Sequence, residues 1–198
     1  IEGLEAMVAE LQKAPASAVD VESTSTDPML AELVGIALSG TEGTGYYVPI
    51  DHKPESGIPN LPMLEVVDKL RPLLQDPDLP KYAHNANYDL TVLAEAGLDV
   101  TPVTCDTMIA EWLIHPGSRN LGLKNLTWNR LGVEMTPIQD LIGTGKKQIT
   151  MDLVAVEKAA PYACADVDMT LRLANLMQPE VRDRALWDLY SELEMPLV

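Results

Sequence analysis

The sequence predicts an α/β protein with a mixed sheet, an antiparallel meander plus parallel strands, flanked by helices. Three strand-like runs separated by turn-rich segments occupy residues 16–50, and such tight spacing favours an antiparallel meander. After residue 60, short strand-like runs alternate with helical patterns, which is typical of parallel strands joined by helices. The chain has 198 residues, 46% of them hydrophobic, which suits one domain with a full core.

The first 50 residues hold the meander and a short segment before it. Residues 1–15 are amphipathic, and we expect a linker or boundary helix there. Three strands are predicted next, and they cover Ala16 to Val21, Leu33 to Leu38 and Tyr46 to Ile50.

The remaining elements are predicted from helix and strand signals. A helix is expected from Asn60, a plausible N-cap, to Leu74. The next elements are a strand over Lys81–His84, a helix over Asn87–Ala96 closed by Gly97, and a strand over Val103–Cys105. From Asp106 the pattern is helical, with turns near Pro116, Gly132 and Gly143, and it ends in a charged helix over Glu180–Glu194. That last helix has nothing to pack against in our prediction, which suggests a piece of a longer protein.

Three pairs of polar residues lie on these elements, at spacings or positions that bring the two members of each pair together. Asp20 and Glu22 end the first strand, and alternation places both carboxylates on one face. Asn85 and Asp89 lie where a strand gives way to a helix. Tyr162 and Asp166 are spaced i, i+4 on a helix and therefore share a face.

Four acids that converge on one point repel one another strongly unless cations lie between them. Asp20, Glu22, Asp89 and Asp166 supply oxygen ligands, which hard divalent cations prefer. The pattern therefore predicts a hydrolytic site with two metal ions.

The order Asp-x-Glu, Asn-x3-Asp and Tyr-x3-Asp resembles the three exonuclease motifs of the DEDD superfamily. The flanking text Asp20-Val21-Glu22-Ser23-Thr24-Ser25, Tyr82 to Asp89, Cys105 to Met108 and Gly143 to Thr150 is similar, more narrowly, to the 3'-5' proofreading exonuclease domain of bacterial DNA polymerase I (family A). This resemblance covers nearly the whole chain. It implies a ribonuclease-H-like fold, an exonuclease domain over residues 16–178, and a connecting helix over 179–198 that leads to a missing polymerase domain.

The resemblance also implies roles for the site residues. Asp20, Glu22 and Asp166 would hold the first of two ions, Mg²⁺ or Mn²⁺. Asp20 would bridge to the second ion, and Asp89 would act largely through water. Glu22 would also contact the terminal 3' hydroxyl, and the released products would be deoxynucleoside monophosphates.

Tyr162 assigns the subclass within the resemblance. It would orient the attacking water, as in the DEDDy type, and Asn85 would support the site and touch substrate. In the histidine subclass a His stands five residues before the last Asp, and here that position is Pro161. His84 belongs to another motif and is not needed as a base.

Substrate contacts are predicted at three further positions, Thr26, Lys146 and Lys147. Thr26 stands where the family often has a leucine that wedges between terminal bases, and Ile138 replaces an aromatic residue of many relatives. Aromatic stacking is worth about 1–3 kcal/mol per base, so a weaker grip on substrate is expected. Lys146 and Lys147 either bind the DNA backbone or decorate a loop.

The charge balance bears on partners. The chain has 14 Lys and Arg against 30 Asp and Glu, a net charge of −16, which argues against tight general DNA binding. The sparse basic residues gather in the second half, at Arg119, Lys124, Arg130, Lys146 and Lys147. We therefore expect a single-stranded or frayed 3' end of DNA to be delivered by a covalently attached polymerase. A monomeric, reduced, cytoplasmic protein without a membrane segment is expected from two cysteines and no long apolar run.

Other interpretations stay open at this point. An RNA-trimming exonuclease of the same superfamily would share the core motifs, and a non-catalytic DNA-positioning module would share the fold. Individually, Asn87 or Asp89 could cap a helix and Tyr162 could be a core residue. Asp168 is expected to be solvated, and Cys105 and Cys164 are expected to be small core residues.

Overall fold

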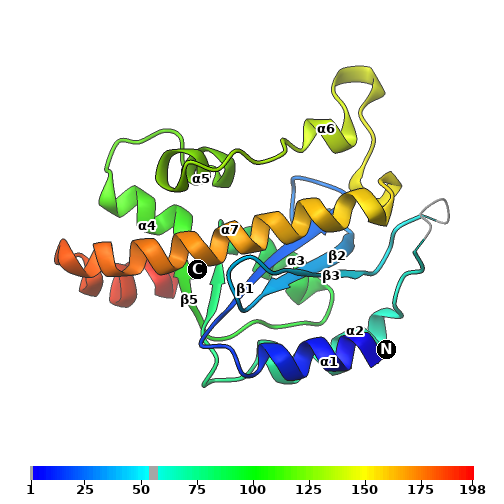
Figure 1. Cartoon of the computed structure of the whole chain (residues 1–198), viewed down its shortest axis with the longest axis horizontal. Coiled ribbons are helices and arrows are strands. Elements are labelled where there is room, and N and C mark those ends of the chain that lie inside the picture. The colour runs from blue at the N-terminus through cyan, green and yellow to red at the C-terminus, as the bar shows by residue number, and fades with distance from the viewer. Residues whose placement is uncertain (1, 54–57) are drawn as a thin grey trace.

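The computed structural model describes residues 2–53 and 58–198. Five strands form one sheet in the order β3-β2-β1-β4-β5 (Figure 1). Their bounds are β1 Ser17–Ser23, β2 Leu33–Ser39, β3 Tyr46–Pro49, β4 Lys81–Ala83 and β5 Val103–Asp106. The strands β1, β2 and β3 pair antiparallel, whereas β4 lies parallel to both β1 and β5. The predicted mixed sheet, a meander extended by parallel strands, is therefore confirmed.

Seven α-helices accompany the sheet in the described part of the chain. They are α1 Glu2–Leu11, α2 Met63–Leu74, α3 Ala86–Glu95, α4 Thr107–Ile114, α5 Leu123–Leu131, α6 Gln139–Ile142 and α7 Val156–Asp183. Short 3-10 turns lie at Gly145–Lys147 and Met151–Leu153. None of the helices within residues 2–53 and 58–198 combines the length and the apolar character needed to cross a bilayer.

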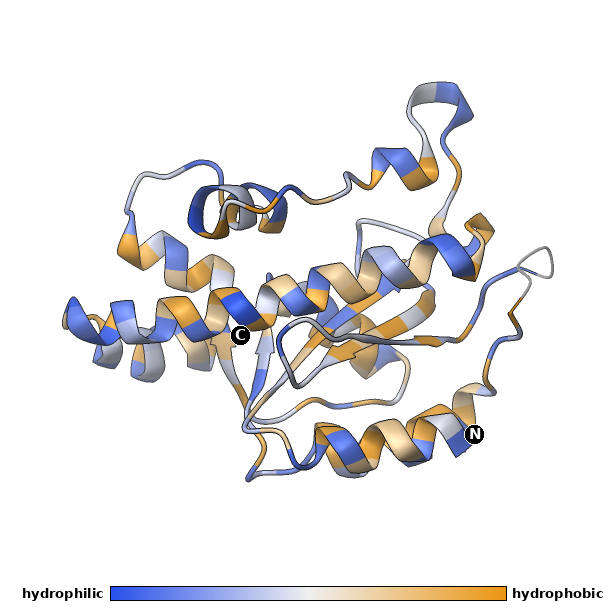
Figure 2. Ribbon diagram, viewed as in Figure 1, coloured by the Kyte–Doolittle hydropathy of each residue, from blue (hydrophilic) through white to orange (hydrophobic). Residues whose placement is uncertain are grey.

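The two faces of the sheet are covered by different helices. Val19 and Val21 of β1 belong to the core shared with α1, α2 and α3, whereas Ala18 packs with Ala163 and Val167 of α7. Figure 1 shows α7 running across the sheet, far from α1 and α2. Figure 2 shows the hydrophobic residues concentrated on the central strands, while the helices alternate hydrophobic and hydrophilic surface. Because side chains alternate along a strand, Asp20 and Glu22 lie on the α7 face with Ala18.

Close packing beside Glu22 depends on a glycine in β2. Gly35 pairs with Glu22 across the ladder, and a Cβ at Gly35 would come within 2.1 Å of the Tyr47 hydroxyl oxygen. The Tyr47 hydroxyl is bonded to Nε2 of His52 at 2.7 Å, and His52 Nδ1 lies 2.8 Å from the Val154 carbonyl oxygen. A side chain at Gly35 would push this chain of contacts away from the sheet.

The helix cap predicted at Asn60 is wrong, and so is the alternative that Asn87 caps a helix. The helix α2 begins at Met63 with Pro62 as its N-cap, and Asn60 instead exchanges hydrogen bonds with the backbone of His52, at 2.9 and 2.6 Å. The asparagine thus ties the loop after β3 rather than the helix start. The helix α3 begins at Ala86, so Asn87 lies inside its first turn and cannot cap it.

The C-terminal segment differs from its prediction in two ways. The helix α7 is continuous to Asp183, and the expected helix over Glu180–Glu194 is broken near Ala185, where φ is +59°. A π-helix at Leu189–Glu194 and a 3-10 turn at Met195–Leu197 follow. The expectation that this segment packs against nothing is wrong, because Tyr190 and Met195 are buried with α4 and α7. The segment folds back onto β5, and this removes the apolar surface of Tyr190 and Met195 from water.

Candidate active site

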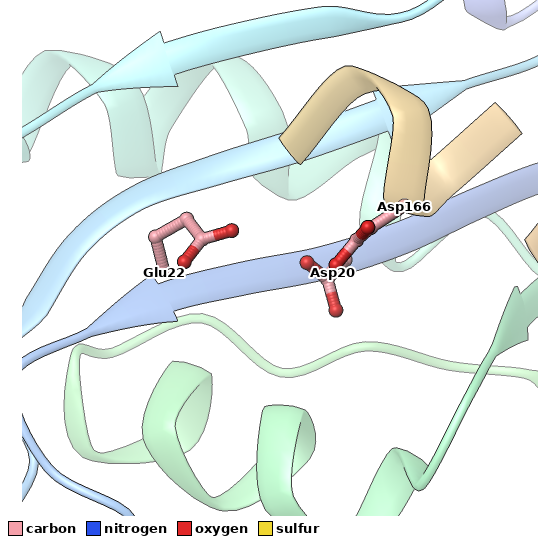
Figure 3. Close-up of side chains that lie close together, drawn as sticks. All are labelled: Asp20, Glu22 and Asp166. Atoms are coloured by element: carbon pink, nitrogen blue, oxygen red, sulfur yellow. The ribbon is translucent and has the colours of Figure 1, made fainter. Parts of the chain in front are cut away.

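Three of the four predicted acids meet at one point. Each of Asp20, Glu22 and Asp166 offers a carboxylate oxygen within 4.8 Å of the others. Figure 3 shows Asp20 and Glu22 on one strand, β1, with Asp166 reaching them from α7. The strand alternation and the packing of α7 on the same face of the sheet together produce this cluster.

Asp89 stands beside the cluster rather than within it. Its side chain lines the same pocket, of about 510 Å³, as Asp20, Glu22 and Asp166. Asp89 is 4% exposed, and among the described residues its buried Oδ2 atom has no hydrogen-bond partner. A buried carboxylate oxygen without a donor is costly unless a cation or an ordered water satisfies it.

Asn85 owes its position to a residue that our sequence reasoning did not single out. Asn85 is the N-cap of α3 and has a left-handed backbone, with φ 65° and ψ 49°. The amide N–H groups of Asn85 and Ala86 donate to the two carboxylate oxygens of Asp106, at 3.2 and 2.7 Å. Asp106 also accepts from the amides of Met108 and Ile109 and so caps α4. One buried carboxylate thus fixes the starts of two helices.

Tyr162 and Asp166 share a face of α7, as their spacing predicted, and both contact Lys124 of α5. The Lys124 ammonium donates to the Tyr162 hydroxyl at 3.1 Å and to the two carboxylate oxygens of Asp166 at 3.2 and 3.3 Å. Its Nζ also lies 4.4 Å from the centroid of the Tyr162 ring. In the sequence Lys124 is one of the scattered basic residues, and no local pattern relates it to residues that lie 38 and 42 positions away.

Burial and mutual repulsion set the charge state of the acids. Burial raises the pKa of Asp20 well above its usual value, the charge of Asp166 adds to the rise, and Lys124 opposes it. Burial, Asp20 and Asp166 raise the pKa of Glu22 in the same way. Burial also raises the pKa of Asp89 and of Asp166. Lys124 opposes the rise for Asp166, as it does for Asp20, but it has no such effect on Asp89. A set of buried oxygen donors that are poorly stabilised as anions fits divalent cations.

The predicted substrate contacts divide into two groups. Thr26 and Asn85 line the pocket of the acids, as does Ile138, which stands where many relatives have an aromatic residue. Lys146 and Lys147 lie in the exposed turn at Gly145–Lys147 and are not among the residues that line this pocket. Whether any of these residues touches substrate stays a prediction.

His84 lines the same pocket, and its environment keeps it neutral. Its Nδ1 lies 2.8 Å from the Thr107 hydroxyl oxygen, and its buried Nε2 has no hydrogen-bond partner within the described ranges. Burial lowers the pKa of His84 to about 4, although Asp106 opposes the shift.

The expectation that Asp168 is solvated is wrong. Its Oδ1 atom accepts from the amide of Gly43 at 2.7 Å and from Nε of Arg172 at 2.9 Å. Asp168 therefore joins the turn between β2 and β3 to α7. Cys105 is fully buried and Cys164 is partly buried, and both are free cysteines.

Sequence comparisons place the chain among known nucleases. A family model described as 3'-5' exonuclease matches residues 1–182. DNA polymerase I of Chloroflexus aurantiacus is 44% identical over 195 residues, which are 97% of this chain and 20% of that protein. DNA polymerase I of Pseudomonas aeruginosa is 34% identical over 200 residues, 99% of this chain and 22% of that protein. The chain thus spans about a fifth of the length of these curated relatives.

Solved structures agree with the fold. NrnC of Brucella melitensis, solved with bound Mg²⁺, superposes with a TM-score of 0.69 at 24% identity, over 91% of this chain and 80% of that one. RNase D of Escherichia coli gives a TM-score of 0.71 at 21% identity, over 96% of this chain and 46% of that one. The match to the family model and the identity to the polymerases lead to one conclusion: the chain belongs to the 3'-5' exonuclease family, of the type found in DNA polymerase I.

Proposed function

We propose that this chain is a metal-dependent 3'-5' exonuclease that acts on DNA and proofreads for an attached DNA polymerase I. The observation that carries the proposal is the convergence of Asp20, Glu22 and Asp166 in one pocket. Beside them lies Asp89, whose Oδ2 atom has no hydrogen-bond partner in the described part of the chain. The 44% identity to a DNA polymerase I favours DNA as the substrate. Released products are deoxynucleoside monophosphates.

The four acids provide the ligands for two divalent ions. Asp20, Glu22 and Asp166 would hold one ion, and Asp20 and Asp89 would hold the other. Such ions supply an activated water at neutral pH and neutralise the charge that develops on the scissile phosphate. Mg²⁺ suits this role because it prefers oxygen ligands and keeps waters in its shell. NrnC, a protein of similar fold, was solved with Mg²⁺.

The remaining side chains position the reactants. The Tyr162 hydroxyl accepts a hydrogen bond from Lys124, which also contacts the acid cluster. This hydroxyl orients the attacking water, as in the DEDDy type. Burial raises the pKa of Tyr162 far above its usual value, so the phenol stays protonated and acts as a hydrogen-bonding group rather than a base. Neutral His84 supplies no cation. Asn85, held by Asp106, and Glu22 contact the terminal nucleotide.

A polymerase in the same protein would solve the problem of weak DNA affinity. The net charge of −16 repels the phosphate backbone, and binding by phosphate contacts alone is therefore unfavourable. Tethering converts capture of the 3' end into an intramolecular step with an effective concentration in the millimolar range or so. Because the relatives are about five times longer, a linked polymerase fits their organisation.

The test is cleavage of a 5'-labelled single-stranded DNA oligonucleotide with Mg²⁺ or with EDTA, resolved on a gel. We expect a ladder that shortens from the 3' end and appears only with metal. Asp20→Ala and Asp166→Ala should each lower the rate roughly 10²-fold or more, because each removes a carboxylate that would hold a metal ion beside the scissile phosphate. Asp183→Ala, an exposed change at the end of α7, is the matched control and should cleave normally. Undiminished cleavage in both site variants would contradict the proposal.

The choice of substrate needs a separate comparison. Rates on DNA and RNA oligonucleotides of matched sequence should favour DNA, and faster RNA trimming would contradict the DNA assignment while leaving the nuclease site intact. If the chain alone fails to cleave, the same assay on the longer protein that includes its polymerase separates weak substrate capture from a non-catalytic module.

A further inference from the structure

Lys124 holds the position of a cation in the cluster of acids. Its ammonium bonds both carboxylate oxygens of Asp166, and Asp166 in turn lies within 4.8 Å of ligand oxygens of Asp20 and Glu22. We propose that Lys124 is an internal counter-ion that occupies Asp166 in the metal-free protein and exchanges with the divalent cation. This inference rests on the metal site of the proposed function.

The charges around the cluster support this role. The positive charge of Lys124 opposes the rise in pKa of Asp20, Glu22 and Asp166, so it stabilises all three as anions. A divalent cation at the same oxygens would do the same with twice the charge. The two cations compete for Asp166, because the oxygens that bond the ammonium are the oxygens offered to a metal.

The geometry of Lys124 suits exchange rather than permanent pairing. Its three polar contacts, at 3.1 to 3.3 Å, are shared among Tyr162 and Asp166 and exceed the roughly 2.7–2.9 Å of a tight ammonium–carboxylate bond. The Lys124 side chain is 29% exposed, so its flexible stem can move toward solvent without unfolding α5. A buried bidentate arginine would not leave so easily.

Competition predicts the sign of a mutational effect. Removing the ammonium removes both the competitor and its repulsion of an incoming cation, and metal affinity must rise. Lys124 as a merely structural support would give the opposite sign, because loss of the support would disorder Asp166 and weaken metal binding. Couplings between two distinct binding sites commonly change affinity about 5- to 150-fold, and we expect the competition at Asp166 to lie within this range.

The experiment is a calorimetric titration of Mn²⁺ into metal-free protein at pH 8. We expect Lys124→Met to tighten Mn²⁺ binding about tenfold. Lys124→Arg should not tighten it, because the arginine keeps the competing charge and pairs with the carboxylate at least as well. The matched control is Lys13→Met, which removes the same charge at an exposed position after α1, on the other side of the sheet from α7. It should leave the affinity unchanged.

A second readout is the melting temperature in EDTA and in saturating Mn²⁺. The rise in Tm on adding Mn²⁺ should be larger for Lys124→Met than for wild type, whereas a structural defect would lower both temperatures equally. Unchanged or weaker Mn²⁺ affinity in Lys124→Met would contradict the proposal that Lys124 exchanges with the divalent cation, but it would not contradict the metal site itself. Absence of Mn²⁺ binding by the wild type would overturn the metal site and this inference with it.

Discussion

At the scale of single residues, the acids of the site lower the stability of the metal-free fold. Asp89 is buried, one of its carboxylate oxygens has no partner within the described chain, and nearby Asp20 repels its charge. Such a group stabilises the protein only when a cation is bound, so removing its charge should stabilise the metal-free fold. Substitutions that relieve a strained functional site commonly gain about 0.5–2 kcal/mol.

We therefore predict that Asp89→Asn raises the free energy of unfolding in EDTA by about 1 kcal/mol at pH 8. The folded-state pKa of Asp89 is raised above 3.8, so the folded wild type binds a proton more readily than the unfolded chain does. The wild type consequently loses stability relative to the variant as pH rises above 3.8, and the two should converge near pH 4. Urea unfolding across this pH range measures the difference. A variant less stable than wild type at pH 8 would contradict the prediction.

At the scale of elements, Asp106 joins β5 to the starts of α3 and α4. Its carboxylate accepts from the amides of Asn85, Ala86 and Met108, and its own backbone exchanges hydrogen bonds with the Tyr190 hydroxyl, at 2.8 and 3.1 Å. The side chain is 2% exposed. Asn85 therefore keeps its left-handed backbone because a buried carboxylate holds its amide.

Asp106→Ala should destabilise the protein by about 2–4 kcal/mol, because a helix cap is lost and buried amides are left without acceptors. Asp106→Asn keeps one acceptor oxygen and should cost less. Because Asn85 lines the pocket, the alanine variant should also cleave DNA more slowly at temperatures where it is fully folded. Denaturant unfolding and the gel assay measure the two effects. A loss below about 0.5 kcal/mol, typical of a surface substitution, would show that Asp106 does not organise these helices.

At the scale of the whole molecule, stability and charge are coupled to the metal. The net charge of −16 and the four acids with raised pKa values disfavour the metal-free fold at neutral pH. Metal ligands must be deprotonated, so binding releases the protons that these raised pKa values retain. Rising pH removes those protons beforehand and therefore strengthens metal binding.

The rise in Tm caused by a fixed Mn²⁺ concentration should thus increase from pH 5 to pH 8. Comparing melts with Mn²⁺ and with EDTA at each pH cancels groups far from the site, which titrate alike in both. His84 lines the pocket, and its lowered pKa makes the metal-free fold more stable as pH rises through 4 to 6.5. The variant Asp20→Ala is the control and should show little Mn²⁺ effect at any pH. A metal effect independent of pH would contradict a site built from protonated acids.

The sequence by itself determined what depends on local periodicity. Strand alternation placed Asp20 and Glu22 on one face, and helical spacing placed Tyr162 beside Asp166, because both periods are properties of the backbone. The spacing of the elements likewise predicted the mixed sheet. The cap predicted at Asn60 and the alternative cap at Asn87 were wrong, because residues that favour caps also occur in loops and in the first turns of helices.

Only the tertiary structure decided which distant groups meet. Lys124 reaches Asp166 because α5 packs on α7, and Asp106 reaches Asn85 because β5 lies beside β4. Asp168 reaches Gly43, in the turn between β2 and β3, because α7 packs against these two strands. Tyr190 is buried because the C-terminal segment folds back onto β5. Such contacts depend on the packing of whole elements, which no local pattern encodes, and they determine the charge and the geometry of the site.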